Sequence, residues 1–345
     1  RHSFPTRRSS DLDYLNVDSE NVVCVSTGTS ALHLAVEAVV NPGEEVLVPS
    51  FTFLSSYQAI SAARAIPVSC DIYEDSLTID LEDAKSKITG KTRAIMPVHY
   101  ASNPASLDKV YELAREYNLR VIEDAAHAFG CSFREKKIGS FGDIICFSFD
   151  GIKNITSGEG GAIVTSDQNV LSIVKDGRLL SIEKDSVKRY LGQRSWDFDS
   201  TRQGYRYHMS NIFAAIGRVQ LKRLDNEFAP KRKSLLNKYI ELLNSNPDII
   251  LQVQDPDADI VPHIFCVRIL NEKRAGLKIA LEESSIPTGI HYKPNHLLTY
   301  YGAGNVKLPT TEKIYNEVLT LPLHPELEIK DVEQICELIT KHLNN

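Results

Sequence analysis

The amino-acid sequence predicts an α/β protein, with a mostly parallel sheet, helices on both faces and a smaller C-terminal α+β domain. From Val22 to Thr165, short β-branched runs alternate with helical patterns, which is typical of right-handed βαβ crossovers. Polar residues follow the expected strands, at the edge where such sheets bind ligands. The chain has 345 residues, more than a single core usually serves, so a second domain is expected.

The first half is expected to supply the main sheet. The predicted strands are Val22–Val25, Glu45–Pro49, Ala65–Cys70, Arg93–Val98, Leu119–Ile122, Ile144–Phe149 and Ala162–Thr165. The predicted helices are Ser30–Val40, Ser55–Arg64, Leu81–Ile88 and Leu107–Tyr117. The last of these has apolar residues at the three- and four-residue spacing of an amphipathic helix.

The second half has a different pattern. Residues 176–208 contain the only tryptophan, Trp196, and form a charged and aromatic excursion without clear periodicity. The elements expected after it are helices Asn211–Leu224 and Phe228–Leu243, a strand Ile264–Leu270, a helix Ala275–Glu283, an extended piece Thr288–His291, and helices Glu312–Leu319 and Lys330–Leu343. We expect a large domain over residues 13–228, lacking part of its N-terminus, and a small domain over 229–345.

Composition narrows the function classes. A net charge of −6 gives no basic footprint for nucleic acid or for an anionic membrane surface. No apolar run approaches the roughly 18 residues that span a bilayer. Six scattered cysteines without Cys-x-x-Cys spacing indicate a reducing, cytoplasmic location and no zinc site. Residues 1–12 do not resemble the rest, and we interpret them as a non-native segment.

A glycine-rich stretch, Phe147–Gly161, holds a single lysine, Lys153, just after an apolar strand. Glycine lets backbone approach a ligand closely. Loss of hydration lowers the pKa of a lysine, and a neutral amine can attack a carbonyl. Taken alone, the stretch is better explained as a surface loop with one solvated lysine.

Three further motifs follow predicted strands. Gly28, Thr29 and Ser30 open a helix, where backbone N–H groups and hydroxyls suit a phosphate, although an ordinary N-cap gives the same pattern. Phe53 follows the second strand and can stack on a planar ring or simply pack. Asp124 follows the fifth strand with His127 three residues later; the alternatives are a capping acid and a core histidine.

These motifs occur together in an order that resembles one family. The motifs are Gly28-Thr29-Ser30-Ala31-Leu32, Val48-Pro49-Ser50-Phe51-Thr52-Phe53, Pro97-Val98-His99-Tyr100, Glu123-Asp124-Ala125-Ala126-His127 and Ser148…Lys153-Asn154-Ile155…Gly158-Glu159-Gly160-Gly161. From about Asp13 to the C-terminus the chain is similar to the DegT/DnrJ/StrS sugar aminotransferases, close to the branch with UDP-4-amino-4-deoxy-L-arabinose aminotransferase. The resemblance implies pyridoxal phosphate (PLP) as cofactor and the aspartate aminotransferase (type I) fold.

The resemblance also assigns roles. Lys153 matches the lysine that binds the cofactor covalently, and Asp124 matches the acid that pairs with the pyridine nitrogen. His127 falls beside the ring, and Phe53 matches the aromatic residue that stacks on it. The matched phosphate contacts are Gly28, Thr29, Ser30 and Ser148.

The sequence departs from the family pattern at two places. His208 stands where relatives often carry an asparagine that reaches the cofactor phosphate of a partner subunit. A further N-terminal segment of the family is absent. The resemblance implies a homodimer that shares its active sites.

The implied reaction is amino transfer from glutamate to a keto-sugar. A nucleotide-linked 4-keto-6-deoxyhexose is expected, for lipopolysaccharide, capsule or other amino-sugar synthesis. A 3-keto sugar or a keto-sugar acid without a nucleotide is an alternative acceptor, and a non-catalytic binding module on the same fold is the alternative from another class. Basic residues of the excursion that could meet a diphosphate are Lys184, Lys188, Arg189, Arg194, Arg202 and Arg206. The stretch Gly289–Pro294 aligns near the sugar pocket.

Overall fold

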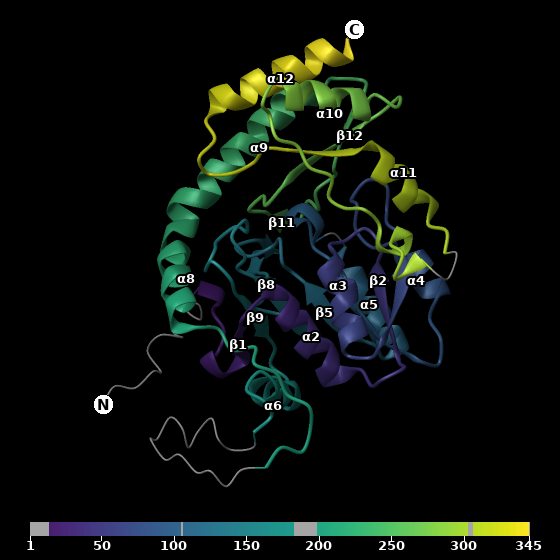
Figure 1. Cartoon of the computed structure of the whole chain (residues 1–345), viewed down its shortest axis with the longest axis vertical. Helices are drawn as coiled ribbons and strands as arrows, with labels where there is room; N and C mark the ends of the chain where they lie inside the picture. Colours follow the sequence, from purple (N-terminus) through teal and green to yellow (C-terminus); the bar gives the residue numbers. More distant parts are fainter. Residues whose placement is uncertain (1–13, 105, 183–198, 303–305, 345) are drawn as a thin grey trace.

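A seven-stranded sheet forms the centre of the computed structural model, which describes residues 14–104, 106–182, 199–302 and 306–344 (Figure 1). The strand order is β1-β9-β8-β5-β4-β2-β3. The strands are β1 (Val22–Val25), β2 (Glu45–Pro49), β3 (Ile66–Cys70), β4 (Thr92–Ile95), β5 (Arg120–Asp124), β8 (Ile144–Ser148) and β9 (Gly161–Val164). Each was expected from the sequence, with bounds that differ by at most a few residues.

Strand direction confirms the mostly parallel sheet. The pairs β2–β3, β2–β4, β4–β5 and β5–β8 are parallel, whereas β9 is antiparallel to both β8 and β1. Six strands therefore end at the same edge, and β9 begins there. The loop between β8 and β9, which carries Lys153, starts and finishes at this edge.

Helices cover both faces of the sheet because alternate strand residues point to opposite sides. Val46, Val48 and Cys146 pack with α2 (Gly28–Val39), α3 (Leu54–Ala62) and α6 (Gln168–Gly177). Leu47 and Ile95 on the opposite face pack with α4 (Leu81–Ser86) and α5 (Leu107–Tyr117). That face continues over Ile145 and Phe147 to the end of α8 (Asn211–Arg223).

The C-terminal part has an apolar cluster of its own. One π-turn, Leu224–Phe228, joins α8 to α9 (Ala229–Leu243), and the two run along the side of the molecule (Figure 1). A three-stranded antiparallel sheet of β10 (Ile249–Leu251), β12 (Phe265–Ile269) and β13 (Val318–Leu321) packs against α9, α10 (Arg274–Glu283) and α12 (Ile329–Leu343). The proposed domain boundary at residue 228 remains a prediction.

Several elements differ from expectation. The helix expected over Glu312–Leu319 is α11 (Pro309–Glu317), and the chain then enters β13, whose Val318 and Leu319 pair with β12. The alternation of β-branched and apolar residues in Val318–Leu321 favours a strand once β12 offers a partner edge. Helix α6, strand β10 and a small sheet of β6 (Ser132–Phe133), β7 (Lys136–Lys137) and β11 (Ala258–Asp259) were not expected.

Some predictions lie outside the described residues. These are the interpretation of residues 1–12 and the positions of Lys184, Lys188, Arg189, Arg194 and Trp196. Within the described ranges, no helix combines the length and apolarity needed to cross a membrane. The same ranges contain no cluster of three His, Cys, Asp or Glu side chains suited to a metal ion, and the six cysteines are free.

Candidate active site

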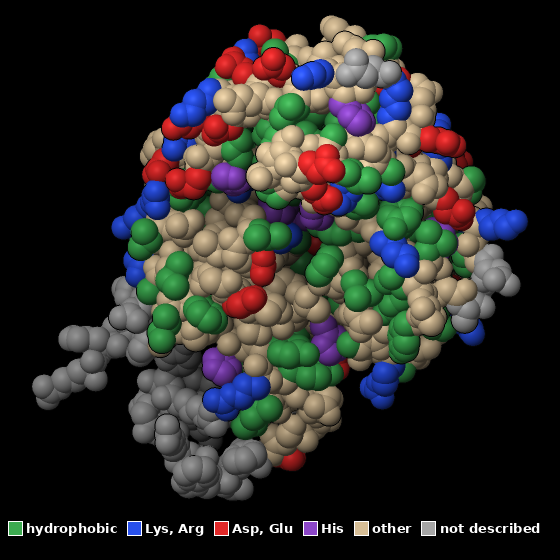
Figure 2. Space-filling model, turned by 45° about the horizontal axis from the view of Figure 1, so that its top comes forward, with side chains coloured by type: hydrophobic (Ala, Val, Ile, Leu, Met, Phe, Trp, Pro, Cys, Tyr) green, Lys and Arg blue, Asp and Glu red, His purple; other side chains and the backbone are tan. Residues whose placement is uncertain are grey.

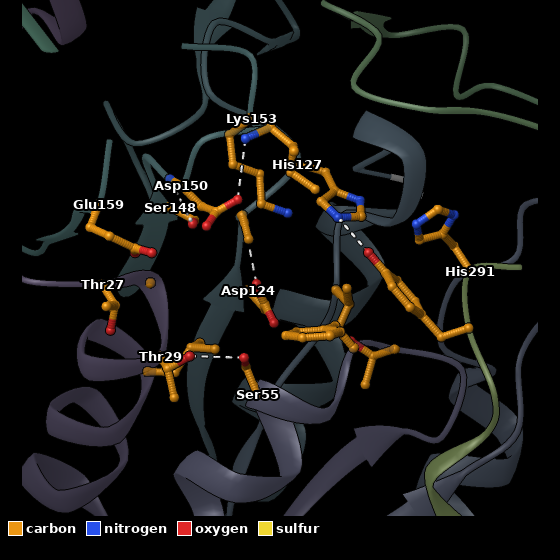
Figure 3. Close-up of a pocket in the computed structure, with 18 residues that line it drawn as sticks. Thr27, Thr29, Ser55, Asp124, His127, Ser148, Asp150, Lys153, Glu159 and His291 are labelled. Carbon is orange, nitrogen blue, oxygen red and sulfur yellow. Dashed lines mark hydrogen bonds between the residues drawn. The ribbon is translucent and has the colours of Figure 1, made fainter. Parts of the chain in front are cut away.

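A cavity of about 280 Å³ lies at the edge of the sheet where the strands end. Residues that follow β1, β2, β5 and β8 line it, and His291 and Tyr292 from the C-terminal part close one side (Figure 3). Figure 2 shows histidine side chains gathered at a hollow in the middle of one face of the molecule. The strand-end argument thus brings separate motifs to one place.

The turn between β1 and α2 approaches β8 very closely. A Cβ placed on Gly28 would lie 2.7 Å from the Cβ of Ser148, and one on Gly161 would lie 2.4 Å from the carbonyl oxygen of Thr27. Only glycine fits at these two positions. The start of α2, with its free N–H groups, is therefore packed against the Ser148 side chain at one end of the cavity.

Ser30 is committed to the turn itself. Thr27 is the N-cap of α2, and its Oγ1 accepts a hydrogen bond from the Ser30 backbone N–H (3.0 Å). The Ser30 hydroxyl lies 2.8 Å from Thr27 Oγ1 and 3.1 Å from Ser26 Oγ. Ser30 is buried and does not line the cavity, whereas Thr27 and Thr29 do.

Lys153 extends into the cavity from the β8–β9 loop. The start of the loop is held by the Phe149 N–H, which donates to the Gly160 carbonyl (2.8 Å). Lys153 Nζ lies 3.4 Å from Nε2 of His263. Loss of hydration lowers the pKa of Lys153, opposed by the negative charges of Asp124 and Asp150. The amine is thereby shifted toward the neutral, nucleophilic form.

Asp124 is the last residue of β5 and is buried at the cavity wall. Its Oδ2 accepts a hydrogen bond from Ser56 Oγ (2.7 Å), and its Oδ1 accepts one from the Ala126 N–H (3.2 Å). Burial raises the pKa of this carboxyl, while the Ser56 and Ala126 hydrogen bonds oppose the rise. A cationic partner in the cavity would favour the carboxylate.

His127 lies beside Asp124 and Tyr292. Its Nε2 is hydrogen-bonded to the Tyr292 hydroxyl (3.1 Å), and its ring lies 4.3 Å, centroid to centroid, from that of His263. Burial, with the nearby cation Lys153, holds the pKa of His127 well below 6.5. The pKa of His291 is also lowered by burial. These imidazoles are neutral at physiological pH.

The cavity also has an aromatic side. Phe53 is 57% exposed, and its ring centroid lies 5.6 Å from that of Tyr292. Thr29 Oγ1 is hydrogen-bonded to Ser55 Oγ (2.8 Å), a pair that Figure 3 shows at the bottom of the view. An exposed phenylalanine at a cavity mouth leaves a ring face free for a planar ligand.

Most of the candidate residues come together. Those that line the cavity are Gly28, Thr29, Phe53, Asp124, His127, Ser148 and Lys153. Ser30 lies behind it, and His208 is bridged to Val25 of β1 outside the lining. Polar lining residues to which the sequence analysis assigned no role are Thr27, Thr52, Ser55, Asp150 and Glu159. Thr27 had a visible signal as the N-cap of the same motif.

Comparison with known proteins gives a consistent result. The model of the DegT/DnrJ/EryC1/StrS aminotransferase family matches residues 13–340. The spore coat polysaccharide biosynthesis protein SpsC of Bacillus subtilis is 31% identical, over 94% of this chain and 85% of that protein.

Solved structures share the whole fold. DesV from S. venezuelae, in complex with a ketimine intermediate, is 32% identical with a TM-score of 0.90, covering 99% of this chain and 89% of that chain. The PLP form of the sugar aminotransferase Spr1654 from Streptococcus pneumoniae is 25% identical with a TM-score of 0.88, covering 98% and 90%. A second structure of Spr1654 is in its pyridoxamine phosphate (PMP) form. The chain therefore belongs to the DegT/DnrJ/EryC1/StrS aminotransferase family, the family of PLP-dependent sugar aminotransferases.

Proposed function

We propose that this protein holds PLP in the cavity through Lys153 and transfers an amino group from glutamate to a nucleotide-linked keto-sugar. The observation that carries the proposal is the Lys153 amine in a cavity with a buried carboxylate, Asp124, and a helix N-terminus packed on Ser148. Each motif taken singly also fits a structural role. A solvated surface loop, however, would not place an amine in this cavity.

The residues present fit the cofactor. The close approach of Gly28 to Ser148 leaves a cradle that a Cβ would fill, lined by hydroxyls of Thr27 and Thr29, which suits a phosphate at a helix N-terminus. Asp124 supplies the negative charge that a protonated pyridine nitrogen requires, and Phe53 offers a free ring face.

When bound, PLP supplies an electron sink next to the substrate carbon. Lys153 acts as the general base and general acid. Its Nζ accepts a proton from the Cα of the amino donor, and later donates a proton to the carbon that was the ketone carbon of the sugar. The lowered pKa of Lys153 suits both directions, since the amine can be neutral for the first step and charged for the second. Asp124, oriented by the hydrogen bond from Ser56, would pair with the ring nitrogen of the cofactor.

His127 and Tyr292 form the wall opposite the phosphate cradle. Both side chains are neutral, because burial lowers the pKa of His127 and raises that of Tyr292. Their hydrogen bond fixes the orientation of the histidine ring at the cavity wall. With a neutral wall, the charges that act on Lys153 are those of Asp124 and Asp150, and their attraction for the amine is strengthened where water is excluded.

For the acceptor, we favour a nucleotide-linked 4-keto-6-deoxyhexose used in surface polysaccharide synthesis, in the cytoplasm. Support comes from the similarity to a spore coat polysaccharide protein and to sugar aminotransferases. Arg202 and Arg206 lie in the described part of the excursion, where a diphosphate could be met. A 3-keto sugar and a keto-sugar acid remain the alternative acceptors.

We also propose a homodimer with shared sites. Ile212 and Val219 of α8 are 73% and 59% exposed, and Ile152 on the lysine loop is 68% exposed. α8 adjoins this loop, because a Cβ on Gly217 would lie 3.3 Å from the Ser157 Cβ. A second copy on this apolar face would reach the cavity, and His208, whose Nδ1 is buried without a partner among the described residues, is the residue we assign to the phosphate of the neighbouring site.

The test is a panel of nucleotide-linked 4-keto and 3-keto sugars and of free keto-sugar acids, each incubated with glutamate and the PLP-loaded protein. Formation of amino sugar and 2-oxoglutarate is measured by mass spectrometry. Borohydride reduction before digestion should attach the cofactor to the peptide that contains Lys153. If cofactor attaches elsewhere, the proposed site is wrong; if no keto-sugar is aminated, the proposed substrate class is wrong.

A further inference from the structure

His263 is a buried histidine that the proposed reaction does not yet use. It precedes β12 and does not line the cavity, so its ring meets Lys153 Nζ from within the protein, at 3.4 Å from Nε2. The other ring nitrogen, Nδ1, is buried without a hydrogen-bond partner among the described residues. The amine of Lys153 is therefore the polar group that lies next to Nε2 of His263.

The backbone around His263 is fixed from two sides. Its N–H donates to Ser102 Oγ (3.0 Å), and its carbonyl accepts from Arg232 Nη1 (3.1 Å), a side chain of α9. The ring also packs against that of His127, with centroids 4.3 Å apart. An imidazole held in this way has little freedom to turn away from Nζ.

The charge state of the ring is equally constrained. Burial is the main cause that holds the pKa of His263 well below 6.5, and the cations Lys153 and Arg232 and the nearby His291 act in the same direction. A neutral imidazole with its proton on Nδ1 presents Nε2 as an acceptor. It can take a hydrogen bond from the lysine amine, but it does not compete for the proton.

We propose that His263 is a positioning residue for Lys153: its Nε2 accepts one N–H of the ε-amine, so that the lone pair of the free amine points into the cavity. A neutral amine has two N–H donors and one lone pair, and an acceptor behind it fixes which of these faces the substrate carbon. When Nζ carries the proton taken from Cα, the same acceptor stabilises the ammonium. The proposal rests on the function proposed above for Lys153.

The groups that face Lys153 define the background for a test. Asp124 and Asp150 raise the pKa of its amine, and loss of hydration lowers it. His127, His263 and His291 are neutral neighbours from other segments. Replacing His263 by methionine removes the acceptor, whereas glutamine has a similar length and keeps one.

The experiment compares H263M with H263Q in the full chain. In the cofactor-free protein, the pKa of Lys153 is measured from the pH dependence of acetylation by acetic anhydride, quantified on the Lys153 peptide. We expect this pKa to fall by about one unit in H263M, because the ammonium loses a hydrogen bond, and to return close to the wild-type value in H263Q. In the loaded enzyme, kcat for the glutamate half-reaction should fall about ten-fold in H263M while KM changes less than about two-fold.

His33 offers a matched control, since it is a buried histidine whose Nδ1 lies 3.3 Å from the Tyr207 hydroxyl, outside the cavity. H33M should leave the Lys153 pKa and kcat unchanged. Should H263M not fold, as judged by thermal unfolding, H263L replaces it with the same expectations. A wild-type pKa in H263M, or equal losses in H263M and H263Q, would overturn the proposal. Wild-type protein that fixes no cofactor at Lys153 would instead refute the proposed function.

Discussion

Gly28 opens helix α2 and Ser148 ends strand β8, yet a Cβ on Gly28 would lie only 2.7 Å from the Ser148 Cβ. This contact brings the N-terminus of α2 against the end of β8. The space between the α2 turn and the Ser148 hydroxyl is the part of the cavity that we assign to the cofactor phosphate. Its size is set by the absence of one methyl group.

Gly28→Ala should therefore weaken cofactor binding. The added Cβ must push Ser148 or the α2 turn aside, which we expect to cost about 1–3 kcal/mol of stability and roughly ten-fold or more in PLP affinity. Fluorescence titration of the cofactor-free protein with PLP measures the affinity. Gly90→Ala is the control, because no atom lies within 4 Å of a Cβ at that position. Equal affinities for G28A and G90A would contradict the assignment.

Replacement of Lys153 tests the proton transfer. Lys153→Ala should still bind PLP without a covalent link, and its glutamate half-reaction should slow by at least about 100-fold, since the general acid and base is lost. Stopped-flow absorbance of the bound cofactor follows the half-reaction. Lys153→Arg keeps the positive charge but has no amine to release, so it should be as slow. Full turnover by K153A would exclude the proposed mechanism.

Asp124 can be changed without changing its shape. Asp124→Asn keeps a hydrogen-bonding group at the end of β5 but removes the negative charge, so we expect bound cofactor and a half-reaction slower by roughly 10–100-fold. Ser56→Ala removes one donor to Asp124 and should have a smaller effect in the same direction. An unaffected rate in D124N, with the cofactor bound, would remove the role given to this acid.

The neutral histidines make acid destabilising. The pKa values of His127 and His263 are held well below 6.5, so near pH 6 the unfolded chain binds more protons than the folded one. Stability should be fully present above about pH 6.5 and fall as the pH drops, by roughly 1.4 kcal/mol per pH unit for each histidine. Asp124, with a raised pKa, has the opposite slope above 3.8, but it is a single group.

Urea unfolding of the cofactor-free protein at pH 7.5, 6.5 and 5.5 measures this dependence. His127→Gln should flatten it by one proton, because glutamine does not titrate. A variant whose stability depends on pH as steeply as the wild type would show that folding does not lower the pKa of His127.

The proposed dimer face can be disrupted on α8. Ile212→Glu combined with Val219→Glu places two charges where we expect a second copy to pack. Light scattering should then report a monomer, and the turnover of this variant should be strongly reduced. Ile279→Glu on α10 is the control, since Ile279 is equally open at 56% exposure but lies away from α8. A wild-type protein that is monomeric and fully active would contradict the shared site.

The fold was largely readable because apolar periodicity and turn residues agree locally. Strands β1 and β2 and helix α5 have the bounds that the sequence suggested. The reversal of β9 was not readable, because Gly161–Val164 has the same composition whichever way it pairs. The strand β13 was missed for a similar reason, since only the neighbouring β12 selects a strand after α11.

Candidate site residues could be predicted from the sequence where a reactive or polar residue directly follows a predicted strand. They could not be predicted where tertiary packing determines which side chain faces the cavity. Asp124, Lys153 and Phe53 could be selected from position and residue type. Ser30 and Thr27 stand in the same motif, and only the N-cap geometry decides which one faces the cavity. His263 approaches from a segment with no motif, so its contact with Lys153 depends on tertiary structure alone.

The antiparallel course of β9 has a consequence for how the chain tolerates change in length. The lysine loop leaves β8 and enters β9 at paired positions, with Ser148 opposite Gly161. Both ends of the loop are therefore fixed by strand pairing, and a shift of either strand cannot absorb an inserted or deleted residue without changing this register. The number of residues between Phe149 and Gly160 therefore determines how far the Lys153 amine extends into the cavity.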